Sequence, residues 1–214
     1  MKQITMALLL GAGASVASAD SLSLTYTGKS GQSAYTNFTS RFVGGSMFYA
    51  DGQGQSFEAF CVEPTQGHAV AADGAVSYAL SRFDDGRATL LQGLFSSSFG
   101  SLSTGYERGA FQMAVWEIVT ESGAALDLAA GDFKFLYLSR TSSASANQDF
   151  AALATSYLTA AAAYSGPALY DIQRLSNGGY QDLVLATAVP EPGTYALLLG
   201  GLGLVGWAKR RRVA

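Results

Sequence analysis

The sequence predicts an α+β fold, in which strands from the N- and C-terminal parts form an antiparallel β-sheet or barrel subdomain and a helical subdomain is inserted between them. Three observations indicate this arrangement. Residues 21–63 alternate apolar and polar side chains, residues 75–164 are rich in helix-forming residues, and strand character returns in residues 169–186.

The N-terminal strands are predicted from period-two alternation. Leu22, Leu24 and Tyr26 alternate with serine and threonine, and residues 35–43, 46–49 and 56–62 follow a similar pattern with glycine-containing turns between them. Cys61 therefore lies near the end of the last of these strands. The C-terminal strands, residues 169–175 and 180–186, are joined by Ser-Asn-Gly-Gly at 176–179, which favours a hairpin.

Three helices are predicted between the two groups of strands. Residues 75–94 have the alanine and leucine content of a helix, and a serine-rich loop is expected over residues 96–103. Thr104 and Glu107 match a capping box, so a second helix is expected to run to Ser122 and to end at Gly123. The third helix is expected from Asp149 to Tyr164, before Gly166-Pro167.

Gln112 has an unusual position on the second helix. A helical wheel places it within a wide apolar arc, and Glu117 and Glu121 face the opposite side. The other members of the arc are Phe111, Val115, Trp116, Ile118 and Val119. A primary amide removed from water without a partner costs about 1–3 kcal/mol. Gln112 should therefore have a specific hydrogen-bonding or covalent partner.

The two ends of the chain are read as signals, which leaves residues 20–188 as one domain. Residues 1–19 form the predicted signal peptide, with Lys2, an apolar run and Ala17-Ser18-Ala19 before the cleavage site. Residues 189–214 contain an uncharged stretch at 195–208 that spans only about 20 Å as a helix. A hydrocarbon core is about 30 Å thick, so this short transmembrane segment can stop translocation without being a permanent anchor.

The C-terminal tail resembles the PEP-CTERM sorting signal of Gram-negative bacteria. The resemblance is carried by the order of three parts: Val189-Pro190-Glu191-Pro192, the short apolar segment, and Lys209-Arg210-Arg211-Arg212. It implies that an exosortase-type membrane protease cuts near the Pro-Glu-Pro, and that transient anchoring in the inner membrane precedes delivery to the cell surface or extracellular matrix. A plain tail anchor is the alternative interpretation.

Composition excludes several classes of function for residues 20–188. The whole chain has 13 Lys+Arg and 16 Asp+Glu. Without Lys2 and the four terminal bases, 8 basic residues remain, and without Glu191, 15 acidic residues remain. The net charge of residues 20–188 is therefore near −7. Nucleic acid is therefore not an expected partner. Cys61 is the single cysteine and His68 the single histidine, so neither an intrachain disulfide nor a histidine-rich metal site is expected, and no cofactor motif is present.

Two interior segments resemble the motifs of bacterial surface thioester domains. They are Phe60-Cys61-Val62 and the run Phe-Gln-Met-Ala-Val-Trp at 111–116. The resemblance implies a β-subdomain with a helical subdomain, and an internal thioester between the Cys61 sulfur and the Gln112 side-chain carbonyl. Phe60, Phe111 and Trp116 would form the surrounding shell. Phe111 departs from the family, which often has threonine there in Gram-positive members.

The thioester would act once and without turnover, so the resemblance implies a covalent binding module rather than an enzyme. An amine or hydroxyl of a surface or matrix polymer, either polysaccharide or protein, would take the acyl group from Cys61. The alternative is a non-covalent structural matrix protein, in which Cys61 is a small buried hydrophobe and Gln112 binds a backbone carbonyl.

Two further arrangements of reactive side chains have the composition of catalytic sites. Cys61 and His68 could form a nucleophile and base, although a lone histidine beside glycine is more often a solvated loop residue. Glu58 and Glu63 on either side of the cysteine, and the pair at 84–85, have the carboxylate chemistry of glycoside cleavage, but solvated turn positions are the favoured interpretation.

Overall fold

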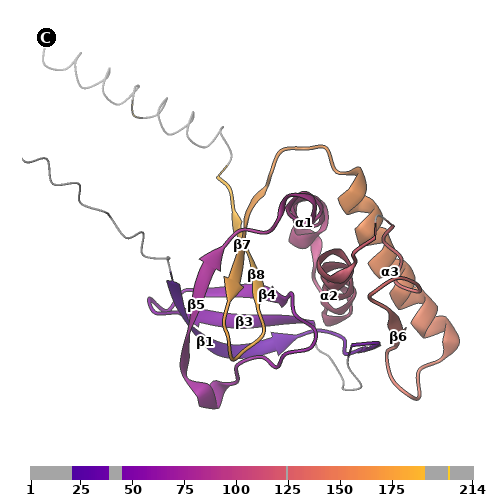
Figure 1. Ribbon diagram of the computed structural model, residues 1–214, viewed down its shortest axis with the longest axis horizontal. Coiled ribbons are helices and arrows are strands. Elements are labelled where there is room, and N and C mark those ends of the chain that lie inside the picture. The colour runs from indigo at the N-terminus through magenta and orange to yellow at the C-terminus, as the bar shows by residue number, and fades with distance from the viewer. Residues whose placement is uncertain (1–20, 39–44, 124, 191–201, 203–214) are drawn as a thin grey trace, which may run out of the picture.

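The computed structural model describes residues 21–38, 45–123, 125–190 and 202. The predicted signal peptide, Glu191 and Pro192, the apolar segment apart from Leu202, and the basic run 209–212 lie outside the described residues. Figure 1 shows the described part of the chain as two layers, with the large sheet on one side and the α-helices on the other.

Six strands form a closed antiparallel barrel in the order β1-β3-β4-β8-β7-β5. Their bounds are β1 (Ser21–Ser30), β3 (Ser46–Asp51), β4 (Ser56–Cys61), β5 (Ala75–Ser81), β7 (Tyr170–Ser176) and β8 (Leu183–Ala188). The N-terminal strands β4 and β5 pair with the C-terminal strands β8 and β7, respectively. The predicted α+β fold, with N- and C-terminal strands in one sheet and helices inserted between them, is confirmed.

The inserted segment contains three helices and a small second sheet. The helices are α1 (Asp85–Ser98), α2 (Gly105–Thr120) and α3 (Ala144–Ala163). The second sheet pairs β2 (Tyr35–Thr36) with β6 (Phe135–Tyr137), and two short 3-10 helices are η1 (Ala71–Asp73) and η2 (Phe99–Ser101). α2 contacts β3 and β4 on one side and the other two helices on the other, so it joins the two layers (Figure 1).

The start of α2 confirms the predicted capping box. The Glu107 amide donates to Thr104 Oγ1 at 3.2 Å, and the Thr104 amide donates to Glu107 Oε2 at 2.8 Å. The backbone amides of Ser103 and Thr104 stabilise the ionised carboxylate and lower the pKa of Glu107 to about 2. This cap fixes the start of the helix that carries Gln112, and the helix ends at Thr120, just before the predicted Ser122.

Residues 75–81 form strand β5 and are not helical, so the predicted first helix was wrong in its first half. The segment closes the barrel by pairing with β1 and β7, and Tyr78 is buried in the middle of it. Its alanine content favoured a helix, but the ladder bonds to two neighbouring strands override that propensity. The expected serine-rich loop is also corrected, because α1 continues to Ser98 and η2 follows it.

Two other element boundaries differ from prediction, and so does Glu117, which was expected opposite the apolar arc of its helix. α3 begins at Ala144 rather than Asp149, with Ser143 as its N-cap. β2 is limited to two residues within the predicted strand 35–43, whose residues 39–43 lie outside the described part. Glu117 is fully buried, because the middle of α2 is enclosed by the barrel and by α1 and α3.

Candidate functional site

Gln112 and Cys61 meet in the interior, where β4 ends against α2. The Gln112 side-chain Nε2 donates to the Cys61 carbonyl oxygen at 2.8 Å, and the Cys61 amide donates to Gln112 Oε1 at 2.9 Å. Gln112 is completely buried and Cys61 is 5% exposed. The specific partner that a buried glutamine requires is therefore the backbone of Cys61.

The position at which β3 begins explains why the Cys61 backbone is open to a side chain. β4 pairs with β3 only as far as Met47 opposite Ala59, so no β3 residue lies opposite Cys61. On its other edge β4 continues beside β8, with Cys61 opposite Leu183 and the Val62 amide donating to Asp182. The Gln112 carboxamide occupies the place that the next strand residue would take, and it completes the ladder at Cys61.

The Cys61 thiol has a sulfur atom as its hydrogen-bond partner. Cys61 Sγ donates to Met47 Sδ at 3.9 Å, and the Tyr49 hydroxyl donates to the same Sδ at 3.7 Å. Burial raises the pKa of the Cys61 thiol well above its ordinary value. Met47 and Tyr49 are not among the predicted site residues, although the alternation in residues 46–49 indicates that both lie on one face of the strand.

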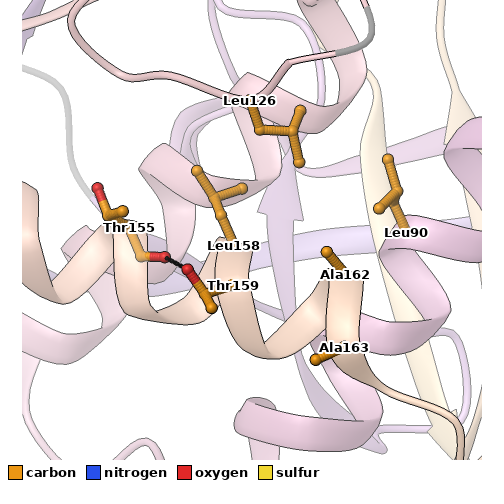
Figure 2. Close-up of a pocket in the computed structure, with 7 residues that line it drawn as sticks. All are labelled: Leu90, Leu126, Thr155, Leu158, Thr159, Ala162 and Ala163. Carbon is orange, nitrogen blue, oxygen red and sulfur yellow. Dashed lines mark hydrogen bonds between the residues drawn. The ribbon is translucent and has the colours of Figure 1, made fainter.

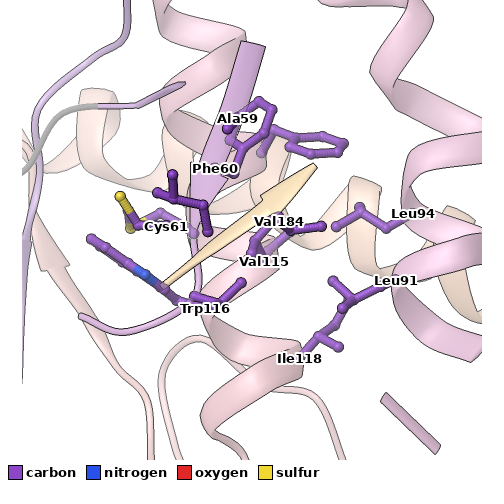
Figure 3. Packing of buried hydrophobic residues seen from close by; sticks show 14 of the residues in the cluster. Ala59, Phe60, Cys61, Leu91, Leu94, Val115, Trp116, Ile118 and Val184 are labelled. Atoms are coloured by element: carbon purple, nitrogen blue, oxygen red, sulfur yellow. The ribbon is translucent and has the colours of Figure 1, made fainter. Parts of the chain in front are cut away.

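The three predicted shell residues are all buried, but they divide between two places. The Phe60 and Phe111 rings pack together with centroids 4.7 Å apart, and Phe95 and Phe99 extend that aromatic cluster towards α1. In the view of Figure 3, the Trp116 indole is drawn on the Cys61 side of the cluster. Trp116 is 1% exposed, and its ring centroid lies 6.0 Å from that of Phe133. Aromatic side chains therefore separate the Cys61–Gln112 contact from solvent.

The described residues do not support a Cys61–His68 dyad. The His68 ring stacks on Tyr26 with centroids 5.1 Å apart, and its Nδ1 lies 2.7 Å from the Ala69 carbonyl oxygen. No interaction within the described part of the chain joins it to Cys61. His68 is half-buried, which corrects its interpretation as a solvated loop residue.

Among the predicted carboxylates, Glu58 differs from expectation and Asp84 does not. Glu58 lies in β4 and accepts from Arg108 Nε at 2.8 Å; both side chains are largely buried, so Glu58 is not a solvated turn residue. Asp84 occupies the N-cap position of α1. Among the residues that the structure describes, no cluster of histidine, cysteine, aspartate or glutamate is suited to hold a metal ion.

A separate apolar groove lies between α1 and α3 (Figure 2). It has a volume of about 560 Å³ and is lined by Leu90, Leu126, Thr155, Leu158, Thr159, Ala162 and Ala163. The Thr159 hydroxyl already donates to the Thr155 carbonyl oxygen at 3.0 Å. The lining contains no titratable side chain, so the groove offers no acid, base or nucleophile.

The first two residues of the sorting motif directly follow the barrel. The Val189 amide donates to the Leu169 carbonyl oxygen at 2.9 Å, and Val189 and Pro190 are both exposed. Within the described ranges, no helix has the length and apolar character needed to cross a membrane. The predicted membrane segment 195–208 falls almost wholly outside those ranges.

Comparison with known proteins identifies the C-terminal signal. The model of the PEP-CTERM protein-sorting motif matches residues 188–212, which confirms the signal expected from the sequence. The chain therefore carries the motif of exported proteins that are held transiently at a membrane before surface display. A search among curated proteins finds no match to the chain.

Two solved structures of bacterial surface domains are similar to this chain. One is the N-terminal domain of the Streptococcus pyogenes pilus tip adhesin Cpa, with 12% identity, coverage of 79% of this chain and 94% of that chain, and a TM-score of 0.49. The other is the N-terminal thioester domain of a surface protein from Clostridium perfringens, with 14% identity, coverage of 79% and 100%, and a TM-score of 0.48.

Proposed function

We propose that this chain is an exported surface or matrix protein in which Cys61 and Gln112 form an internal thioester, and that the thioester covalently captures an amine or hydroxyl of a surface polymer. One observation carries the proposal. The Gln112 carboxamide is bound to Cys61 by hydrogen bonds of 2.9 and 2.8 Å in the buried interior, so the acyl donor and the thiol belong to residues in direct contact.

Formation of the thioester would exchange one bond at the Gln112 side chain for another. Cys61 Sγ attacks Gln112 Cδ, the Sγ–Cδ bond forms, and the Cδ–Nε2 bond breaks. The thiol proton goes to the departing nitrogen, which leaves as ammonia. No oxidant, metal or cofactor is needed for this step.

The Cys61 amide is suited to assist that attack. Negative charge develops on Gln112 Oε1 as sulfur adds to Cδ, and this oxygen already accepts from the Cys61 amide at 2.9 Å. A donor at about 2.7–3.1 Å from a developing oxyanion is the arrangement that stabilises such intermediates. Burial raises the pKa of the thiol and keeps the thiolate fraction low, so the rate of attack would depend on the close positioning of the two groups. Sγ would give up its contact with Met47 Sδ when it bonds to Cδ.

In the capture step, nitrogen would be the attacking atom and sulfur the leaving group. A target amine attacks Gln112 Cδ, the new Cδ–N bond forms, and sulfur departs and takes up a proton as the free Cys61 thiol. A hydroxyl target would leave an ester in the same way. The aromatic side chains around the pair would keep water from the acyl group until then. The linkage is made once, so the chain is a binding module and not a turnover enzyme.

A non-covalent matrix protein is the second candidate, and a specific observation favours it. Both polar groups of Gln112 are satisfied by the Cys61 backbone, and the thiol has a partner in Met47. A buried glutamine with this pairing has a structural role without any covalent chemistry.

Intact mass separates the two candidates. The purified exported chain should be lighter than its sequence by one ammonia. Methylamine should add at Gln112 and leave the chain heavier than its sequence by one methylene group, because the product is an N-methylamide. Cys61→Ala should have the full mass and remain inert to methylamine. Gln92→Ala, which removes a glutamine of α1, should keep the ammonia deficit. A full-mass wild-type chain that does not react with methylamine would establish the non-covalent candidate instead.

Processing of the tail has its own test. The match at 188–212 supports cleavage near Val189-Pro190-Glu191-Pro192 by an exosortase-type membrane protease of a Gram-negative bacterium, followed by release to the cell surface or matrix. The C-terminus of the released chain, determined by peptide mapping in the native host, should lie close to these residues. A released chain that retains Lys209-Arg210-Arg211-Arg212 would exclude the cleavage.

A further inference from the structure

A small polar cavity is lined by residues of β6, of the turn after it and of the start of α3. Figure 1 shows these two elements on the helix side of the molecule. The cavity has a volume of about 370 Å³, and it is lined by Tyr137, Ser139, Arg140, Ser142 and Asn147. Tyrosine is the one aromatic residue of this lining. The others carry hydroxyl, guanidinium and amide groups, and no carboxylate is among them.

The walls of this cavity are fixed by local contacts. Tyr137 lies opposite Tyr35 in the β2–β6 sheet, and the two rings stack with centroids 4.7 Å apart. The Ser142 amide donates to the Ser139 carbonyl oxygen at 3.1 Å, and the Ser139 amide donates to Ser142 Oγ at 2.8 Å. Asn147 Oδ1 accepts from the Leu138 amide at 2.9 Å. A ligand would therefore meet a largely preformed surface.

The cavity presents hydrogen-bond donors that its own structure does not use. Three of the five arginines in the described ranges pair with carboxylates, namely Arg82, Arg108 and Arg174. Arg140 is exposed and has no such pair within those ranges. The Asn147 amide nitrogen likewise has no partner among the described residues, although its oxygen is engaged. A guanidinium and an amide N–H group together suit a carboxylate ligand that also carries hydroxyls.

We propose that this cavity binds an acidic saccharide, of the kind in which a uronic acid is part of a polymer. The C–H face of the pyranose ring would pack on the Tyr137 ring, whose face carries negative charge density. Arg140 would bind the carboxylate, and Asn147 with Ser139 and Ser142 would bind the ring hydroxyls. An acidic peptide is less well matched, because the lining offers one aromatic ring and no aliphatic surface for peptide side chains.

This site is distinct from the Cys61–Gln112 pair and does not depend on the thioester. Its residues come from β6, the turn after it and the first part of α3, whereas Cys61 and Gln112 lie on β4 and α2. Binding here would be non-covalent and reversible. Cys61→Ala should bind the saccharide as the wild type does, so failure of either proposal can be recognised separately.

Calorimetric titration of the purified full-length chain in mild detergent tests the site. Oligogalacturonate is the acidic probe and maltohexaose the neutral one, and only the acidic probe should bind measurably. Tyr137→Ala and Arg140→Gln should each weaken binding by about tenfold, the change expected when one aromatic or charge-assisted contact is removed. Tyr137→Phe should bind as the wild type does, since it keeps the ring.

The matched control is Arg82→Gln, which removes the same charge from an exposed arginine beyond β5. It should leave saccharide binding unchanged. Thermal unfolding of each variant identifies any loss of fold, and Tyr137→Phe and Arg140→Gln keep the test informative if Tyr137→Ala is unstable. Absence of oligogalacturonate binding by the wild type, equal loss in Arg82→Gln, or equal binding of polyglutamate would each overturn the proposal.

Discussion

The side chain of Gln112 acts as a strand neighbour for Cys61. Its carboxamide donates to the carbonyl and accepts from the amide of the same cysteine, as the backbone of an adjacent antiparallel residue would. The pairing of β3 with β4 does not reach Cys61, so Gln112 of α2 makes the hydrogen bonds that a β3 residue would otherwise make. The two layers of the molecule are therefore joined by polar contacts at the residue where the proposed chemistry occurs.

Loss of this pairing should destabilise the chain whether or not a thioester forms. Gln112→Ala leaves the buried amide and carbonyl of Cys61 without partners, and we expect the free energy of unfolding to fall by about 2–4 kcal/mol. Chemical denaturation measures it. Gln92→Ala is the matched control: it loses a half-buried bond to Ser96 Oγ and should cost only about 1 kcal/mol. Equal losses in the two variants would contradict a special role for the Gln112 pairing.

The free thiol of Cys61 should be inert in the folded chain. Burial raises its pKa, so little thiolate is present near neutral pH, and the aromatic side chains restrict access. After methylamine treatment, or in a chain without the thioester, alkylation by iodoacetamide should be slow until the protein is unfolded. Its rate should still be rising at pH 9, because the thiolate fraction increases towards the raised pKa.

An exposed thiol provides the comparison for that experiment. Ala152 is exposed on α3, so Ala152→Cys in the Cys61→Ala background places one cysteine at the surface. We expect this thiol to be alkylated at least about tenfold faster under native conditions, since reactivity follows thiolate content and exposure. Similar native rates for the two cysteines would show that Cys61 is more accessible than its burial indicates.

Local signals in the sequence were sufficient for much of the fold and for the conclusion that Gln112 needs a partner. Thr104 and Glu107 predicted the start of α2, because a capping box depends on neighbours within one turn. Alternation predicted β1, β3 and β4, and the position of Gln112 in an apolar arc predicted that it would have a specific partner. That this partner is the Cys61 backbone depends on where β3 begins beside β4. No local sequence pattern indicates how far this strand pairing extends.

The failures have a common physical cause, which is tertiary contact. Val76, Tyr78 and Leu80 do alternate with smaller exposed residues, but the alanines of the segment favoured a helix until pairing with β1 and β7 is considered. Glu117 was placed opposite the apolar arc because a wheel compares sides of one helix only. The wheel cannot show that other elements cover α2 on every side.

Close packing of α1 against α3 depends on Gly93. A Cβ atom at this position would lie 2.3 Å from the Ala161 carbonyl oxygen, so the helices would have to separate. We expect Gly93→Ala to lower the free energy of unfolding by about 1–3 kcal/mol, the usual range for overpacking. Gly86→Ala, also in α1, meets no atom within 4 Å and should be stabilising by about 0.4–1 kcal/mol. A stabilising Gly93→Ala would show that the helices are not in this contact.

Glu117 should give the folded chain a pH-dependent stability near neutrality. Burial, and then the charges of Glu121, Asp127 and Asp132, raise its pKa to about 7, although the Asp127 amide donates to its Oε1 at 2.6 Å. The folded chain therefore binds a proton that the unfolded chain releases near pH 4.5, and the free energy of unfolding should fall as pH rises from there to about 7. We expect a loss on the order of 3 kcal/mol across this window.

Glu117→Gln tests this assignment, because glutamine keeps an acceptor for the Asp127 amide and cannot ionise. The fall in stability between pH 4.5 and about 7 should disappear, and the variant should be the more stable protein at pH 8. Glu107 provides an internal control. Its pKa is lowered to about 2, so its contribution is present above pH 4.5 and is lost as pH falls towards 2, in both proteins. Denaturation midpoints measured from pH 3 to 8 separate the two pH windows. If stability of Glu117→Gln still falls with the same slope above pH 4.5, that pH dependence belongs to other groups.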